Sequence, residues 1–408
     1  MKQKDKQTYK FLLRLNEAGG IDVHKESFKV AACRESEPPV EKEFGTFTKD
    51  LYALRDFLLE QKMCNVIMES TGVYWKPLYR VLTEAGIKVT VANPLKVKQI
   101  PMEKTDRKDA KWLAKLLMND MVKPSFIPDE QQEQLREFTR MRTKYVQQMT
   151  RAKNQIVRLL ESCNFKIRSI VSDISTKTAQ KLIEAISKGE TDVNMLIELC
   201  HHSVRKRHGD EKLKQALQGR LTAHIQRQFA MLIEDLRYFE KQKVRTDREL
   251  NELLTEKQQQ MITKLNQVEG VSQQQGEIIM AEIGAGISSF ADADAAAKYA
   301  GLSPGQHETA DKSKPVRAIP GNKHLRVAMV QTAWSAVKVK DGYWMAEYQH
   351  LKKRIGAKKA ILATARKMFK AIYKILTTDH QYQKWDAKKY YDDCLKTFAY
   401  KAALKKVA

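Results

Sequence analysis

Two long stretches of the chain carry mostly apolar residues in steps of three and four, the spacing of a heptad seam along a helix. The first seam consists of Leu135, Phe138, Arg142, Tyr145, Met149, Ala152, Ile156 and Leu159. The second consists of Leu221, Ile225, Phe229, Leu232, Leu236, Phe239, Lys243, Thr246, Leu250 and Leu253. Because a long amphipathic helix is stabilised mainly by packing of its apolar face, the seams predict an antiparallel coiled-coil stalk, within one chain or between subunits.

The segment before the seams has the periodicity of alternating strands and helices. Apolar runs bounded by turn residues predict two strands within 19–35 and single strands within 41–48, 65–71 and 88–94. Amphipathic patterns predict helices within 50–61, 73–86 and 105–120. The order is three strands, helix, strand, helix, strand, helix, which is the order of an RNase H-like α/β fold.

Prolines at 124 and 128 separate this segment from the first seam. We therefore expect an α/β domain at 18–122, a coiled-coil helical region at 129–256, a mostly helical C-terminal domain at 257–380 and a tail at 381–408. Within the third part, residues 265–284 resemble a helix-hairpin-helix, whose turn would offer backbone N–H groups to phosphate. A plain αα-hairpin is the alternative.

A long loop punctuated by glycine and proline follows at 298–326. Loops of this length inside a domain are usually functional or disordered. Five of its cations are the candidate nucleic-acid contacts, namely Lys312, Lys314, Arg317, Lys323 and Arg326.

The charge balance indicates a polyanionic partner. The chain has 73 lysines and arginines against 49 acids, a net charge of +24. A merely soluble, highly charged surface is the alternative. The chain has no apolar run long enough to span a bilayer, so no membrane partner is expected. Five scattered cysteines are typical of a reduced cytoplasmic chain without a disulfide framework.

Four carboxylates stand out against this basic background. Asp22 falls inside the first strand, and Glu69 ends the fourth. Asp106 and Asp109, three residues apart, share one face of the helix predicted at 105–120. The ends of neighbouring strands meet at one edge of a sheet, and the helix can close over that edge. Four carboxylates gathered there would repel one another unless divalent cations lay between them. Two Mg²⁺ ions, or Mn²⁺, about 4 Å apart would suit phosphodiester chemistry.

Each acid also has an ordinary interpretation. Asp22 could end a strand in a turn, and Glu69 could cap the following helix. Asp106 could interact with a helix dipole, and Asp109 could be a surface acid. Taken singly these interpretations are favoured, but they need a coincidence to place all four acids where one fold gathers them.

Several motifs together resemble a known family. They are GIDVHKE, MESTGVYW, VANPLKVKQI, KTDRKDAKWLAKLL, VEGVSQQQGEIIMAEIG, YAGLSPGQ and GNKHLR. The chain from about 18 to 380 resembles the DEDD transposases of bacterial insertion-sequence family one-hundred-ten, which are bridge-RNA-guided recombinases. The resemblance implies a RuvC-like N-terminal domain with Asp22, Glu69, Asp106 and Asp109 in the acidic positions, and a serine-type C-terminal transposase domain.

The same resemblance points to a nucleophile. The family has a serine five residues after the proline of its GLxP motif, and this chain has Thr309 there. Threonine keeps the hydroxyl but is β-branched and more hindered. Three alternatives stay open: Thr309 attacks DNA, Ser313 substitutes for it, or this copy is impaired.

The resemblance further implies partners. Donor and target DNA, a structured guide RNA and other copies of the chain, as a dimer or tetramer, are expected in the bacterial cytoplasm near the nucleoid. Two other functions compete. A RuvC-like structure-specific nuclease, such as a junction resolvase, would cut with metal-activated water and need no hydroxyl at 309. A catalytically impaired relative would only bind nucleic acid.

Overall fold

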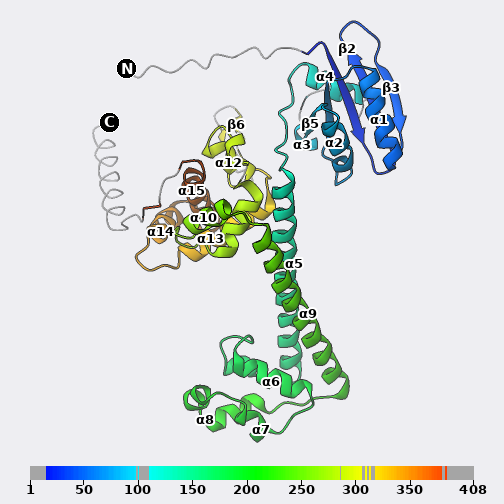
Figure 1. Ribbon diagram of the computed structural model, residues 1–408. Coiled ribbons are helices and arrows are strands. Elements are labelled where there is room, and N and C mark those ends of the chain that lie inside the picture. The colour runs from blue at the N-terminus through cyan, green and yellow to red at the C-terminus, as the bar shows by residue number, and fades with distance from the viewer. Residues whose placement is uncertain are drawn as a thin grey trace, which may run out of the picture. The chain divides into compact units, whose positions relative to one another are not determined.

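Figure 1 shows the computed structural model of the chain. It describes residues 15–97, 100, 110–284, 286–305, 308–309, 312–313, 318–378 and 382–383. The chain divides into two compact units, Met1–Ile127 and Pro128–Ala408. Most of the expected tail at 381–408 lies outside the described residues.

The first unit is built on a five-stranded mixed sheet with the order β3-β2-β1-β4-β5. Its strands are β1 (Glu17–Val23), β2 (Phe28–Arg34), β3 (Val40–Phe44), β4 (Asn65–Glu69) and β5 (Lys88–Ala92). Strand β1 runs antiparallel to β2 and parallel to β4. The predicted order of strands and helices is confirmed, and the sheet is consistent with an RNase H-like domain.

Helices cover both faces of this sheet. They are α1 (Thr48–Glu60), α2 (Trp75–Glu84), α3 (Pro94–Val97) and α4 (Ala110–Met118). Helices α1 and α2 share a core with one face of β1, through residues such as Leu54, Leu78 and Ile21. Helix α4 packs on the other face, against Ala18, Ala31 and Cys33. The sequence did not predict α3, and the first residues of the helix predicted at 105–120 lie outside the described residues.

The contact between α4 and β1 is unusually close because small residues line both sides. Ala18 and Ala31 of the sheet meet Ala110 and Ala114 of the helix. A Cβ atom placed on Gly20 would lie 1.9 Å from the carbonyl oxygen of Ala110, so only glycine fits there. The beginning of α4 is thereby fixed directly on strand β1.

Replacing Gly20 should therefore break this contact. We expect Gly20→Ala to destabilise the first unit by about 3 kcal/mol or more, because the new methyl group meets the helix backbone and not a movable side chain. Urea unfolding of the purified chain measures the change.

The adjacent Gly19→Ala is the matched control. Its Cβ would meet only the tips of Val66 and Leu58 at 3.1 and 3.2 Å. Its unfolding free energy should stay within about 1 kcal/mol of the wild-type value. Equal losses in the two variants would contradict the close approach.

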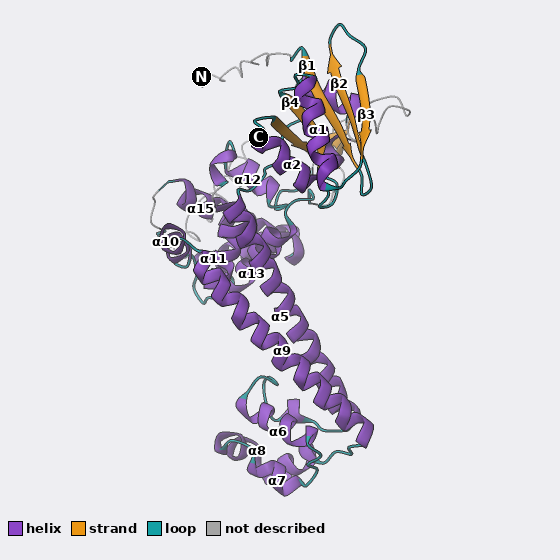
Figure 2. Ribbon diagram, turned by 45° about the vertical axis from the view of Figure 1, so that its right-hand side comes forward, coloured by secondary structure: helices purple, strands orange, loops and turns teal. Residues whose placement is uncertain are grey.

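Two long helices dominate the start of the second unit: α5 (Glu130–Ser162) and α9 (Ala223–Leu253). They lie side by side in both views (Figures 1 and 2). They run antiparallel, since the side chain of Gln131 donates to the carbonyl oxygen of Leu253 at 3.1 Å. Every residue of the two predicted seams is buried or half-buried. The seams thus pack as expected within one chain, while their description as a coiled coil stays a prediction.

Short helices connect α5 to α9: η1 (Ile167–Ser169), α6 (Lys177–Ser187), α7 (Val193–Glu198) and α8 (His202–Leu217). They pack on the ends of the two long helices around a core of their own, which includes Phe165, Leu182 and Phe229. One apolar core therefore forms where the sequence left a region without clear periodicity.

The remaining chain forms a mostly helical part with its own core. Its elements are α10 (Glu256–Leu265), α11 (Gln273–Ile279), η2 (Met280–Gly284), η3 (Ile287–Ser289), α12 (Ala293–Tyr299), β6 (Glu308–Thr309), β7 (Lys312–Ser313), α13 (Lys323–Ala336), α14 (Tyr343–Ile355) and α15 (Ala357–Thr377). Leu135 of α5 belongs to this core, so the start of the long helix packs with it. The boundary predicted at 256/257 stays a prediction.

Helices α10 and α11 form the αα-hairpin of the expected helix-hairpin-helix region. Its turn contains Gly270 at φ +85°. A Cβ atom there would lie 2.5 Å from the carbonyl oxygen of Thr332 in α13. The turn thus packs closely on another helix, and its use as a phosphate contact stays a prediction. Among the residues that the structure describes, no helix combines the length and apolarity that crossing a membrane requires.

Candidate catalytic site

Asp22 and Glu69 lie next to each other in the sheet of the first unit. The last residues paired between the parallel strands β1 and β4 are Ile21 and Met68, and the two acids are the next residue of each strand. Ile21 and Met68 point into the core beneath α1 and α2. Because side chains alternate along a strand, both acids point to the face that α4 covers. The carboxyl ends of two neighbouring strands therefore present two carboxylates on one face.

Helix α4 begins close to these acids. Its C-terminal end lies beside the start of β1, since the backbone nitrogen of Leu15 donates to the oxygen of Met118 at 3.0 Å. Its first residue, Ala110, lies on Gly20, two residues before Asp22 on the same face. The helix thus runs antiparallel to β1, and its N-terminus points to the edge that carries Asp22 and Glu69. The dipole of α4 places positive potential at that edge.

Asp106 and Asp109 lie outside the described residues. Their approach to Asp22 and Glu69 stays a prediction.

The structure contradicts one of the ordinary interpretations, the capping of α2 by Glu69. The N-cap of α2 is Tyr74, five residues beyond Glu69, so Glu69 does not occupy the cap position of this helix. Asp22 lies within β1, and the turn begins after the strand, where the backbone nitrogen of His24 donates to the oxygen of Ser27 at 3.1 Å.

The donor set fits a hard divalent cation. Carboxylate oxygens are the ligands that Mg²⁺ and Mn²⁺ prefer in proteins. The Asp22 side chain is 16% exposed, and its Oδ2 lies 2.9 Å from Nε2 of His24. Within the described ranges no group of three or more metal-ligating side chains is found, and two of the four candidate ligands lie outside those ranges. Asp22 and Glu69 would supply half of such a site.

Thr309, the candidate nucleophile, lies in a small β-hairpin of the second unit. Strands β6 and β7 pair antiparallel, with Thr309 opposite Lys312 and Glu308 opposite Ser313. Thr309 and Ser313 therefore belong to opposite strands. The sequence did not predict this hairpin. Arg317 and Lys314 lie outside the described residues, Lys323 is exposed at the start of α13, and Arg326 is half-buried one turn later.

The residues just before and just after the hairpin segment contact each other. The backbone nitrogen of Ile319 donates to the oxygen of Ser303 at 3.1 Å. A Cβ atom on Gly321 would lie 2.4 Å from the backbone nitrogen of Gly301. The two backbone segments can therefore touch only because neither glycine carries a side chain. The YAGLSP and GNKHLR motifs thus form the base of the segment that carries Thr309.

Beside this base lies a buried polar network that the sequence did not predict. The carboxylate of Glu282, which is 0% exposed, accepts from Nε and Nη2 of Arg140, both at 2.8 Å. It also accepts from Nδ2 of Asn322 at 2.7 Å. Tyr299 Oη lies 3.2 Å from both Asn322 Nδ2 and Arg136 Nη2. Burial alone would raise the pKa of Glu282, but the hydrogen bonds from Arg140 and Asn322 and the nearby arginine charges outweigh it and hold the pKa below its usual value.

One sequence signal could have indicated this network. Glu277 and Glu282 lie in the apolar run GEIIMAEIG, where an acid is costly unless it is paired. Glu277 pairs with Arg142, the arginine noted inside the first seam, which also lies 3.3 Å from Asp247 of α9. Glu282 lies in η2, a single π-helical turn, which is a feature often found at functional sites.

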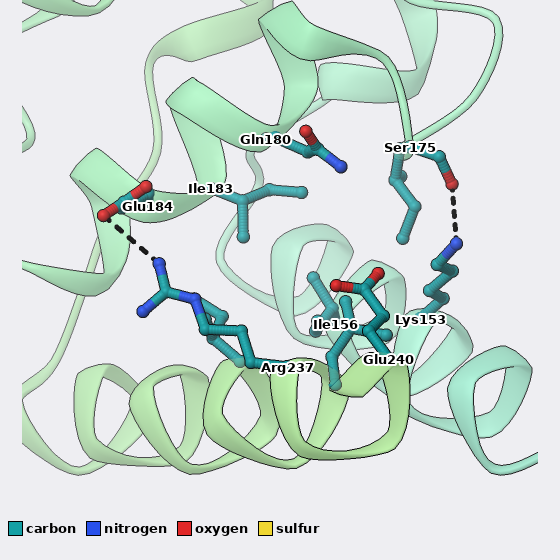
Figure 3. Close-up of a pocket in the computed structure, with 11 residues that line it drawn as sticks. Lys153, Ile156, Ser175, Gln180, Ile183, Glu184, Arg237 and Glu240 are labelled. Carbon is teal, nitrogen blue, oxygen red and sulfur yellow. Dashed lines mark hydrogen bonds and ion pairs between the residues drawn. The ribbon is translucent and has the colours of Figure 1, made fainter. Parts of the chain in front are cut away.

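A pocket of about 210 Å³ lies between α6 and the two long helices α5 and α9 (Figure 3). Several polar side chains that line it bind one another: Arg237 forms an ion pair with Glu184 at 3.3 Å, and Lys153 donates a hydrogen bond to Ser175 at 2.8 Å. None of the candidate site residues lines it. The pocket therefore belongs to the packing of the connecting helices.

Comparisons with known proteins agree with these features. Residues 19–165 match a family model described as a transposase, of the DEDD IS110 type. Residues 262–350 match the model described as the transposase IS116/IS110/IS902 family. The first match spans both described acids, and the second spans Thr309, Glu282 and Asn322. No curated protein matches the chain.

Proposed function

Because the chain belongs to the IS110 family of DEDD transposases, we propose that it excises and inserts a mobile element by cutting and exchanging DNA strands at a divalent-metal site. The family makes it a DNA-processing enzyme. One observation carries the more specific proposal: Asp22 and Glu69 follow the last paired residues of adjacent parallel strands and point to the same face. Asp106 and Asp109 would complete the ligand set.

The proposed reaction proceeds in two transesterification steps. Divalent cations, when bound by the four acids, would polarise the phosphodiester and stabilise the departing oxygen. The hydroxyl oxygen of Thr309 attacks phosphorus, the bond from phosphorus to the departing strand oxygen breaks, and that oxygen takes up a proton in place of the one the hydroxyl loses. A strand hydroxyl then attacks the protein–DNA ester, which rejoins DNA and restores the Thr309 hydroxyl. No separate energy source is needed, because each step exchanges one phosphodiester for another.

Partners follow from charge and from the family. Transposases bind DNA, and the excess of cations suits contacts to its backbone. We propose that Lys312, Lys314, Arg317, Lys323 and Arg326 contact phosphates. A structured guide RNA would supply sequence recognition by base pairing with donor and target DNA. A dimer or tetramer would supply several copies of the acidic and hydroxyl sites, in the bacterial cytoplasm near the nucleoid.

A junction-resolvase-like nuclease remains the second candidate. It is favoured by one observation: position 309 carries the more hindered threonine where the family has its nucleophilic serine. Hydrolysis by a metal-activated water would need no protein hydroxyl at that position. The impaired relative would bind nucleic acid without forming any product.

The test uses the chain together with a plasmid that carries its gene and the DNA on both sides. Co-expression from that region also supplies any RNA encoded there. In Mg²⁺ we expect cut strands and a protein–DNA adduct that survives denaturing gel electrophoresis and disappears after protease treatment. Chelation of the metal should remove both. Cut strands without an adduct would favour the nuclease, and salt-sensitive binding without products would contradict an active enzyme.

A further inference from the structure

Asn322 connects the buried Glu282 to the base of the Thr309 hairpin. Its Oδ1 accepts from the backbone nitrogens of His324 and Leu325, both at 3.1 Å, and so caps α13. Its Nδ2 donates to Glu282, and its backbone nitrogen donates to the oxygen of Tyr299 at 2.7 Å. The amide is therefore fixed in one orientation, with its oxygen on the helix and its nitrogen on the carboxylate.

Glu282 is in turn held by the long helix α5. Arg140 makes two parallel hydrogen bonds to the carboxylate, a geometry that restricts both groups more than a single contact would. Arg136, also on α5, donates to the backbone oxygens of Ala281 and Glu282. The chain of contacts thus runs from α5 through the π-helical turn to Asn322 and the first turn of α13.

A buried ion pair of this kind contributes little to net stability, because desolvation offsets its attraction. It does restrict geometry, since a buried charge cannot move away from its partners without losing hydrogen bonds. The network lies beside the contact between Gly301 and Gly321, where the hairpin segment leaves and returns. Its location matches a role in holding that base in one arrangement.

We propose that Glu282 and Asn322 are positioning residues that fix the base of the Thr309 hairpin for attack on DNA. This inference rests on the proposed function. Attack needs the nucleophile aligned with phosphorus, and a displacement of about 1 Å can cost about 100-fold in rate. Glu282 and Asn322 act through the base of the hairpin and do not take part in bond making themselves.

The test exchanges the donor and the acceptor of one hydrogen bond. Asn322→Asp keeps an acceptor that caps α13 but removes the donor to Glu282 and sets two carboxylates against each other. We expect adduct formation to slow about 10- to 100-fold at saturating DNA, with DNA affinity unchanged. In the double variant Asn322→Asp/Glu282→Gln, the glutamine amide donates to the aspartate and the total charge is that of the wild type. Because the glutamine nitrogen replaces the oxygen that also accepts from Nη2 of Arg140, this exchange should recover only part of the loss and raise the rate at least about threefold above that of Asn322→Asp.

The second buried pair supplies a matched control. Glu277 is buried to a similar degree and pairs with Arg142, but within the described part of the chain no hydrogen bond links it to the hairpin base. Glu277→Gln should lower stability comparably, while the folded fraction forms adduct within about threefold of the wild-type rate. A loss of rate in Glu277→Gln equal to that in Asn322→Asp would overturn the proposal, as would failure of the double variant to recover.

Amide hydrogen exchange tests the anchor without any reaction. In Asn322→Asp, the backbone amides of Ile319 and Asn322, which donate to Ser303 and Tyr299, should exchange at least about tenfold faster than in the wild type, and in the double variant they should regain protection. Unchanged exchange in Asn322→Asp would also overturn the proposal. If the wild-type chain forms no adduct, the proposed function fails, while these exchange rates still decide whether Glu282 and Asn322 anchor the segment.

Discussion

Asp22→Asn should abolish metal-dependent strand cleavage, lowering its rate by about a thousandfold or more. The carboxylate lies at the edge of the sheet beside Glu69, and asparagine keeps its shape but not its charge. A metal ligand set that loses one charge binds the cation more weakly and stabilises the departing oxygen less, a loss of about 4 kcal/mol in transition-state stabilisation. Single-turnover cleavage measured in saturating Mg²⁺ tests this rate.

Binding should be spared in the same variant. DNA affinity depends on cations spread over the chain, so the dissociation constant for Asp22→Asn should stay within about threefold of the wild-type value at the same salt concentration. Glu69→Gln should reproduce both results. The control is Glu43→Gln, which removes an exposed carboxylate from β3 of the same sheet and should leave cleavage unchanged. Full activity of Asp22→Asn and Glu69→Gln would rule out the proposed metal mechanism.

A second measurement separates metal binding from catalysis. A cation that binds only the folded chain raises the unfolding temperature by mass action. Mg²⁺ or Mn²⁺ should therefore stabilise the wild type and Glu43→Gln but not Asp22→Asn. Equal stabilisation of all three proteins would show that the cations bind elsewhere.

The first unit was predictable from sequence because its signals are local. Apolar runs bounded by turn residues predicted the strands of the sheet, and the order of elements placed Asp22 within the first strand and Glu69 at the end of the fourth. Their adjacency needed only one further step, since parallel neighbours have their carboxyl ends at the same edge. The start of α4 was less predictable. It depends on Gly20 and Ala110 touching across 90 residues of sequence, and no local pattern records that contact.

The second unit shows where such reasoning fails. The seams predicted which residues of α5 and α9 are buried. They gave no indication of which polar side chains would form hydrogen bonds with residues distant in sequence. Arg140 and Glu282 lie 142 positions apart in sequence, and a helical pattern indicates only that one side of α5 is charged. The hairpin was missed because its two-residue strands are too short for alternation to show. Both features depend on tertiary contacts that periodicity does not encode.

Thr309→Ala should eliminate the covalent protein–DNA adduct and all strand exchange, because the proposed nucleophilic oxygen is absent. Thr309→Ser should react at least as fast as the wild type, since serine carries the same hydroxyl without the β-methyl group. The measurement is the yield of protease-sensitive adduct and of rejoined strands, with DNA binding followed in parallel.

Ser313→Ala is the matched control, because it removes the other hydroxyl of the same hairpin. It should keep adduct formation near the wild-type level. If Ser313→Ala loses the adduct and Thr309→Ala retains it, the nucleophile lies on β7 and not on β6. Strand cutting that persists in Thr309→Ala at the wild-type rate, while Asp22→Asn abolishes it, would instead identify a nuclease that uses metal-activated water. The pair of variants thus decides between covalent recombination and hydrolysis on the same α/β domain, because only the covalent route requires a protein oxygen.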